Sequence, residues 1–145
     1  MRVAVLNGPN LNLLGEREPA LYGAGTLAAL EADSRAVAAG LGVELSWMQT
    51  NHEGEMVEAV QGLPGTADGA VVNPAAWTHT SVALRDAFLA VRVPFIEVHL
   101  TNIHAREPFR RQSLLADLAV GVITGLGPAG YRYALEALAA HLRGD

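Results

Sequence analysis

The chain has 145 residues, of which 50% are hydrophobic and 17% are charged. This length and composition predict one folded domain with a sizeable core and argue against a disordered chain. The net charge of −5 argues against a surface that binds nucleic acid, and the absence of cysteine excludes disulfides and thiol chemistry. All ten basic side chains are arginines, so no lysine side chain is present to form a Schiff base.

The first residues carry no recognisable targeting segment. Met1 leads directly into an expected strand, without the charged region and cleavage site of a signal peptide. No uninterrupted apolar run approaches the ~18 residues that are needed to span a bilayer. These features are compatible with a cytoplasmic location, which we expect.

Strand-like and helix-like patterns alternate along the whole chain. In chain order, the patterns predict a strand at 2–6, a helix at 26–39, a strand at 43–48, a helix at 53–61, a strand at 69–72, a helix at 81–91, a strand at 95–99, an irregular segment at 100–118, a strand at 121–124 and a helix at 128–142. The second strand alternates apolar and polar residues and is therefore expected at an edge of the sheet.

This alternation predicts an α/β fold without a repeat or a domain boundary. We expect a single catalytic domain over residues 1–145, with a flavodoxin-like, doubly wound, five-stranded parallel sheet. Its expected strand order is 2-1-3-4-5, with helices on both faces.

The stretch between the first strand and the first helix is unusually long for a compact domain. Loops of this length are typically lids or binding loops, and we expect a lid over about residues 11–25. The stretch carries one arginine, Arg17, and one tyrosine, Tyr22. We hypothesise that the guanidinium of Arg17 lowers the pKa of Tyr22, so that the tyrosinate acts as a catalytic base.

Polar residues follow several of the expected strands at their carboxyl ends, where ligands bind in parallel sheets. They include Asn7 and Asn10 after the first strand, residues 73–79 after the third, and His99, Thr101 and Asn102 at the fourth. Glu97 and His99 stand inside an otherwise apolar strand. Strand alternation places both on one face, although they need not touch.

Several other site types fit the sequence less well. Residues 125–130 match G-x-G-x-x-G, but the chain ends before a further strand with an acidic residue, so a tight turn and a helix start are expected. Glu97, His99 and His104 have ligand types that suit zinc, but their spacing does not support a metal site. Ser81 is expected to be a helix N-cap and not a nucleophile.

A flavin-binding electron-transfer module remains the main alternative on fold alone. Such a module needs a Ser/Thr/Gly-rich phosphate loop after the first strand and aromatic side chains that stack on the flavin. The loop here is instead rich in Asn, Leu and Arg, and Tyr22 is its only aromatic residue. The sequence therefore favours an enzyme that uses polar side chains over a flavin carrier.

Five blocks of sequence, in order, resemble the type II 3-dehydroquinate dehydratases: residues 7–23, 49–54, 73–81, 97–107 and 121–127. The resemblance spans nearly the whole chain. It implies the dehydration of 3-dehydroquinate to 3-dehydroshikimate, in the shikimate route to aromatic amino acids or in quinate breakdown. It also implies a metal-free and imine-free anti elimination through an enolate, no cofactor, and a dodecamer built from trimers.

The resemblance also implies roles for individual residues. Tyr22 matches the proton acceptor, Arg17 the residue that activates it, His99 the proton donor to the leaving hydroxyl, and Asn10 the residue that holds a water against the enolate oxygen. The positions that bind substrate are matched by Asn73, His79, Arg110 and the backbone of Leu100 and Thr101, and Asp86 matches a residue that reaches a neighbouring subunit's site. The roles of Glu97, Arg106 and Arg111 stay open.

Overall fold

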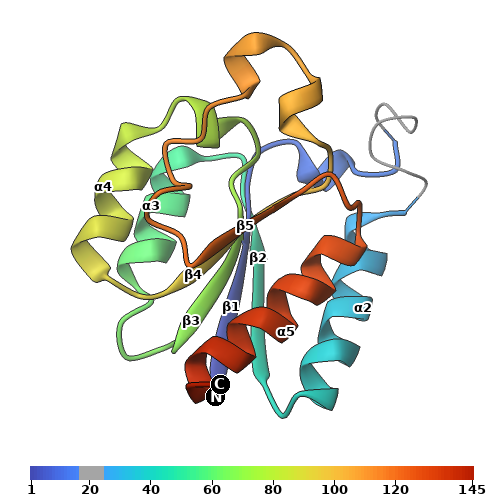
Figure 1. The fold of residues 1–145 in the computed structure, drawn as a ribbon, viewed down its shortest axis with the longest axis vertical. Coiled ribbons are helices and arrows are strands. Elements are labelled where there is room, and N and C mark those ends of the chain that lie inside the picture. Colours follow the sequence, from blue (N-terminus) through green and yellow to red (C-terminus); the bar gives the residue numbers. More distant parts are fainter. Residues whose placement is uncertain (17–24) are drawn as a thin grey trace.

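A parallel sheet organises residues 1–16 and 25–145, the part of the chain that the computed structural model describes (Figure 1). Its strand order is β2-β1-β3-β4-β5, as expected. The strands are β1 (Arg2–Asn7), β2 (Glu44–Gln49), β3 (Gly69–Asn73), β4 (Phe95–His99) and β5 (Gly121–Thr124).

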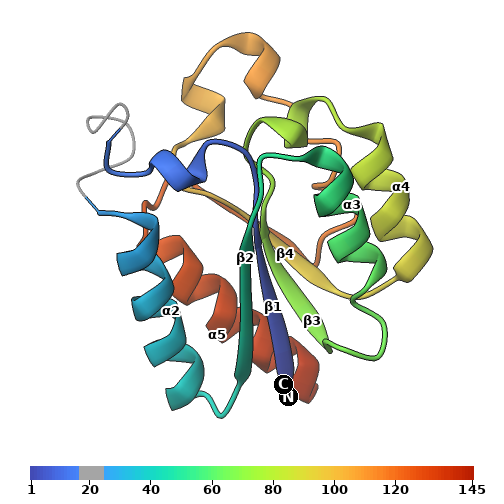
Figure 2. The ribbon, with the colours of Figure 1, turned by 180° about the vertical axis from the view of Figure 1, so that it is seen from behind.

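Helices cover both faces of the sheet. Helices α2 (Leu27–Gly40) and α5 (Ala129–Arg143) lie on one face, and α3 (Glu53–Gln61) and α4 (Val82–Val91) lie on the other (Figures 1 and 2). The irregular stretches contain short 3-10 helices at Leu11–Leu13, Ala75–His79, Ile103–Ala105 and Pro108–Arg110. None of the helices in the described ranges is long and apolar enough to cross a membrane.

Hydroxyl side chains begin two of the helices where the sequence predicts. The side chain of Thr26 accepts a hydrogen bond from the Ala29 backbone N–H at 3.1 Å, and that of Ser81 accepts one from Leu84 N–H at 2.9 Å. These bonds satisfy N–H groups that have no partner within the helix. The N-cap expected at Ser81 is confirmed.

The core consists of two apolar clusters, one on each face of the sheet. Along β1, Val3 and Val5 belong to the cluster under α2 and α5, whereas Ala4 and Leu6 belong to the cluster under α3 and α4. Alternate side chains of a strand point to opposite faces, so a strand covered on both faces is apolar throughout. The edge position expected for the second strand is confirmed by the strand order.

Two glycines bring the loops at the carboxyl ends of the strands together. A Cβ atom at Gly8 would lie 2.5 Å from the Pro74 carbonyl oxygen, so only glycine allows the chain after β1 to approach the chain after β3 this closely. Gly125 has a φ of +89°, and a Cβ there would lie 2.9 Å from Cβ of Asn102. The turn expected at 125–130 is confirmed, and α5 follows it.

Candidate active site

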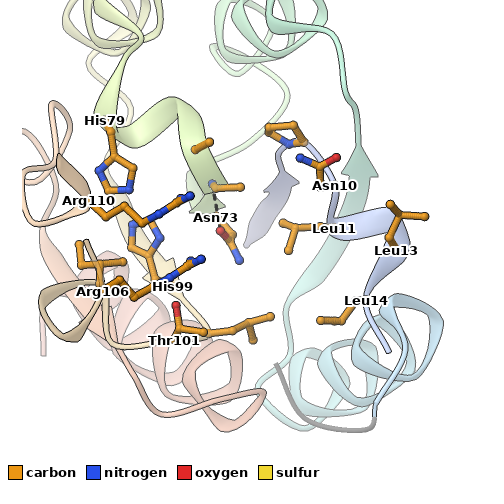
Figure 3. A pocket seen from close by; sticks show the side chains of 15 residues that line it. Asn10, Leu11, Leu13, Leu14, Asn73, His79, His99, Thr101, Arg106 and Arg110 are labelled. Atoms are coloured by element: carbon orange, nitrogen blue, oxygen red, sulfur yellow. Dashed lines mark hydrogen bonds between the residues drawn. The ribbon is translucent and has the colours of Figure 1, made fainter. Parts of the chain in front are cut away.

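A pocket with a volume of about 150 Å³ opens at the carboxyl ends of β1, β3 and β4 (Figure 3). The chain segments that follow these strands supply its lining. The pocket brings together seven of the residues expected at the site: Asn10, Asn73, His79, His99, Leu100, Thr101 and Arg110. Residues that are up to 100 positions apart in sequence thus share one cavity because parallel strands all end at the same edge.

The pocket has two chemically different walls. His79, His99, Arg106 and Arg110 lie together on one side, and Asn10 lies on the other with the apolar wall, which consists of Leu11, Leu13 and Leu14 (Figure 3). Such a cavity suits a small anionic molecule that carries several oxygen atoms on a carbon frame.

His99 is held by a buried carboxylate. Its Nε2 lies 2.7 Å from Oε2 of Glu97, and the two residues are only 5% and 0% exposed. The other carboxylate oxygen, Oε1, accepts a hydrogen bond from the Ser113 hydroxyl at 2.6 Å. A carboxylate accepts the Nε2 proton and stabilises a positive imidazole, which leaves Nδ1 as the nitrogen that can serve the pocket.

His79 is fixed by a backbone carbonyl. Its Nδ1 lies 2.8 Å from the Gln112 oxygen, and a carbonyl oxygen can only accept, so Nδ1 carries the proton. Burial is the main cause that lowers the pKa of His79, and the nearby His99 and Arg110 lower it further. The ring is therefore neutral at neutral pH, and its Nε2 can accept a hydrogen bond from a ligand hydroxyl.

Leu100 and Thr101, which follow β4, also line the pocket. The Leu100 carbonyl accepts from Gly127 N–H at 3.0 Å, and the Thr101 carbonyl accepts from the Thr124 hydroxyl at 2.9 Å. Both carbonyls are thus bound to the segment at the end of β5. Nearby, Nε of Arg110 donates to Oε2 of Glu107 at 2.5 Å, which holds the guanidinium at the pocket.

Among the expected residues that the structure describes, one does not line the pocket. Asp86 is an exposed residue of α4 and does not line the cavity. Arg17 and Tyr22 lie outside the described residues, as does most of the lid expected at 11–25. Of that lid, Leu11–Leu13 forms a 3-10 helix, and the buried Leu11 and Leu14 belong to the core cluster under α2 and α5.

The sequence left two features of the site open and gave no sign of a third. Arg106, whose role stayed open, lines the pocket, and Glu97, which was expected to share a face with His99 without needing to touch it, contacts His99 directly. Ser113, which binds Glu97, was not singled out at all. The arginine-rich stretch after β4 was a usable signal for Arg106, whereas no local pattern marks Ser113.

Metal binding finds no support in the described ranges, where no three His, Cys, Asp or Glu side chains are placed to hold an ion. Glu97 and His99 instead bind one another, and His104 is exposed. The three-residue ligand set considered for zinc therefore does not assemble.

Comparison with known proteins identifies the family of the chain. The family model for dehydroquinase class II matches residues 1–139. A 3-dehydroquinate dehydratase, or hydro-lyase, of Tolumonas auensis is 57% identical over 141 residues, which cover 97% of this chain and 93% of the relative. A catabolic 3-dehydroquinase of Aspergillus oryzae is 53% identical over 141 residues, which cover 97% of this chain and 92% of the relative.

A solved structure agrees with these sequence relatives. The crystal structure of type II dehydroquinase from Propionibacterium acnes is similar with a TM-score of 0.92 and 41% identity, and the match covers 96% of each chain. The comparisons give no support to the flavin-binding alternative. The chain belongs to the class II dehydroquinase family.

Proposed function

We propose that this chain is a type II 3-dehydroquinate dehydratase, which converts 3-dehydroquinate to 3-dehydroshikimate by anti elimination of water through an enolate. The observation that carries the proposal is the shared pocket of His79, His99, Asn73 and Arg110 in a chain of this family. The substrate is a hydroxylated ring with a carboxylate and a ketone, and the pocket offers hydrogen-bonding and cationic groups for each.

The elimination needs a base, a group that stabilises the enolate and an acid. The base removes a proton from the carbon next to the ketone, and the electron pair moves onto the ketone oxygen to form the enolate. As the enolate collapses, the bond to the β-hydroxyl breaks, and the acid supplies the proton with which that oxygen leaves as water. No oxidant, reductant or metal takes part in this balance.

His99 suits the role of the acid. The buried Glu97 accepts its Nε2 proton at 2.7 Å and can stabilise the imidazolium, so that Nδ1 can give its proton to the leaving hydroxyl. Asn10 suits the group that holds a water against the enolate oxygen, because a neutral amide does not compete as a base. Asn10 itself is anchored by its backbone N–H, which donates to Oδ1 of Asn51 at 2.9 Å.

Tyr22 is proposed as the base, with Arg17 lowering its pKa. The other two tyrosines are poor candidates: burial raises the pKa of Tyr131, and Tyr133 is exposed on α5 away from the pocket. A Cβ atom at Gly15 would lie 2.9 Å from the Gly25 oxygen, and Leu14 lines the pocket. The segment that carries Arg17 and Tyr22 is thus joined to the described chain beside the pocket.

The remaining roles concern binding and assembly. We assign Asn73, His79 and Arg110 to the ring oxygens of the substrate, and the N–H groups of Leu100 and Thr101 to its carboxylate. Asp86 is exposed on α4 and is therefore available to a neighbouring subunit. The dodecamer, the cytoplasmic location, the lid and the choice between biosynthesis and quinate breakdown stay predictions.

An assay of the purified chain with 3-dehydroquinate tests the proposal. The product contains a conjugated enone, which absorbs in the ultraviolet where the substrate does not. We expect the absorbance to rise as substrate disappears, without added metal, flavin or nicotinamide. Absence of the enone, or tight uptake of added FMN, would reverse the assignment.

A further inference from the structure

A buried chain of hydrogen bonds connects the C-terminal helix to the pocket. Asn7 ends β1, Asn73 ends β3 in register with it, and Tyr131 lies in the first turn of α5. The three side chains are 0%, 2% and 1% exposed, and only Asn73 lines the pocket. Three polar side chains that are shielded from solvent must satisfy one another or the backbone.

The backbone groups at the two ends of this row of hydrogen bonds determine the direction of every bond in it. At one end, the Ala75 backbone N–H, which can only donate, lies 3.1 Å from Oδ1 of Asn73. At the other end, the Met48 carbonyl, which can only accept, lies 3.0 Å from Nδ2 of Asn7. An amide oxygen can only accept and an amide nitrogen can only donate, so the first contact identifies Oδ1 of Asn73 and the second identifies Nδ2 of Asn7. Both amide orientations are thereby assigned.

The Tyr131 hydroxyl is the link that joins the two asparagines. Its oxygen accepts from Nδ2 of Asn73 at 2.9 Å, and its proton goes to Oδ1 of Asn7 at 2.6 Å. Burial raises the pKa of Tyr131, which keeps the hydroxyl protonated and able to make both bonds. Its ring packs against Trp47 with the centroids 5.9 Å apart, so the hydroxyl has little freedom to move.

We propose that Tyr131 is a positioning residue, which fixes the Asn73 amide so that one of its N–H groups is presented to a hydroxyl of the substrate. One hydrogen of Nδ2 is used by Tyr131 and the other is left for the ligand. The inference rests on the proposed function, because it takes the substrate to be the hydroxylated ring. It assigns Tyr131 a role through Asn73 and not in the chemical step.

The test replaces Tyr131 by phenylalanine, which keeps the ring but removes the link. We expect KM for 3-dehydroquinate to rise about fivefold, as for the loss of one hydrogen bond, while kcat stays within about twofold. Tyr133→Phe is the matched control for the substitution, because Tyr133 is exposed on the same helix. Ala139→Gly is the control for lost stability, because glycine destabilises the helix at a buried position of α5 that is away from Asn73. Both control variants should keep the wild-type KM.

A double-mutant cycle separates positioning from general damage. In an Asn73→Ala background, Tyr131→Phe should have no further effect on KM, because the group it positions is gone. A wild-type KM in Tyr131→Phe would overturn the proposal. An equal rise in KM with and without Asn73 would also overturn it.

Two further measurements test the inference if Tyr131→Phe does not fold or if the wild-type protein shows no turnover. If Tyr131→Phe does not fold, Asn7→Ala replaces it: the Tyr131 hydroxyl then loses its acceptor and can turn its hydrogen toward Asn73. A raised KM supports the inference, and a wild-type KM overturns it. If the wild-type chain shows no turnover, the proposed function fails, and a crystal structure of Tyr131→Phe then decides: a turned Asn73 amide supports positioning, and an unchanged amide overturns it.

Discussion

His99 and Glu97 form a buried pair in which the imidazole Nε2 and the carboxylate Oε2 lie 2.7 Å apart. Both belong to β4, and alternation along the strand puts them on the same face. Ser113 binds the far oxygen of the carboxylate at 2.6 Å, so Glu97 presents a fixed acceptor to the imidazole. In this pair, Nε2 of His99 donates a hydrogen bond to Glu97, and Nδ1 is left to exchange a proton with a ligand.

Glu97→Gln is expected to lower kcat by about ten- to a hundredfold, the range for a hydrogen bond to a charged group. The single amide oxygen would accept from Ser113, so the amide N–H2 would face Nε2 of His99 and oppose the imidazolium. Steady-state kinetics with 3-dehydroquinate measure the loss. Glu136→Gln, at an exposed site on α5, should retain wild-type kcat. A kcat within about twofold of wild type in Glu97→Gln would show that the carboxylate does not support the acid.

Arg110→Lys is expected to raise KM by about tenfold. In wild type, Nε of Arg110 is bound to Glu107, and the remaining N–H groups of the guanidinium are left for the substrate. Lysine keeps the positive charge but lacks this planar fork of donors. Arg111→Lys is the matched control, since Arg111 is the next residue, is exposed and does not line the pocket. Equal KM values in the two variants would remove Arg110 from the binding site.

The protein should become less stable as the pH is lowered through the range in which His79 takes up a proton. Burial lowers its pKa below the 6.5 of an ordinary histidine, so the unfolded chain takes up a proton before the folded chain does. Stability therefore drops as the pH falls from about 6.5 to the lower pKa of the folded state, and the loss is complete below it. Urea unfolding of wild type and of His79→Asn at about pH 8 and about pH 5 measures the loss in the free energy of unfolding between the two pH values. The variant should lose less stability; an equal loss would place the effect elsewhere.

Treatment with borohydride in the presence of substrate should leave the activity unchanged. Borohydride traps imines between a ketone and a lysine, and all ten basic side chains of this chain are arginines. The residual activity after dialysis is the measurement, and a lysine-dependent aldolase provides a positive control for trapping. Inactivation that depends on substrate would mean that an amine, such as the N-terminus, takes part in the reaction.

The sequence predicted the fold closely because its patterns are local. Unbroken apolar strands, Ser81 as a helix cap, and the glycine-rich turn at 125–130 each report a nearby physical requirement. The structure moves no predicted helix or strand end by more than one residue. Asn73, His79 and His99 could be placed at one edge because the carboxyl ends of parallel strands meet there.

The contacts that connect distant segments could not be predicted in the same way. Ser113 binds Glu97 from 16 positions away, and Tyr131 binds Asn7 across 124 positions. Neither serine nor tyrosine is unusual at such positions, and the bonds depend on how loops and α5 pack on the sheet. Arg106 belongs to an arginine-rich stretch, but only the folded chain shows which arginines line the pocket.

The most direct test of the mechanism is the comparison of kcat and substrate affinity in wild type and Tyr22→Phe. We expect kcat to fall by at least about a hundredfold, while the dissociation constant for 3-dehydroquinate stays close to wild type, because only the phenol oxygen is lost. Tyr133→Phe should behave as wild type in both measurements. A Tyr22→Phe enzyme that retains wild-type kcat would contradict a tyrosinate base, and with it the proposed route of the proton.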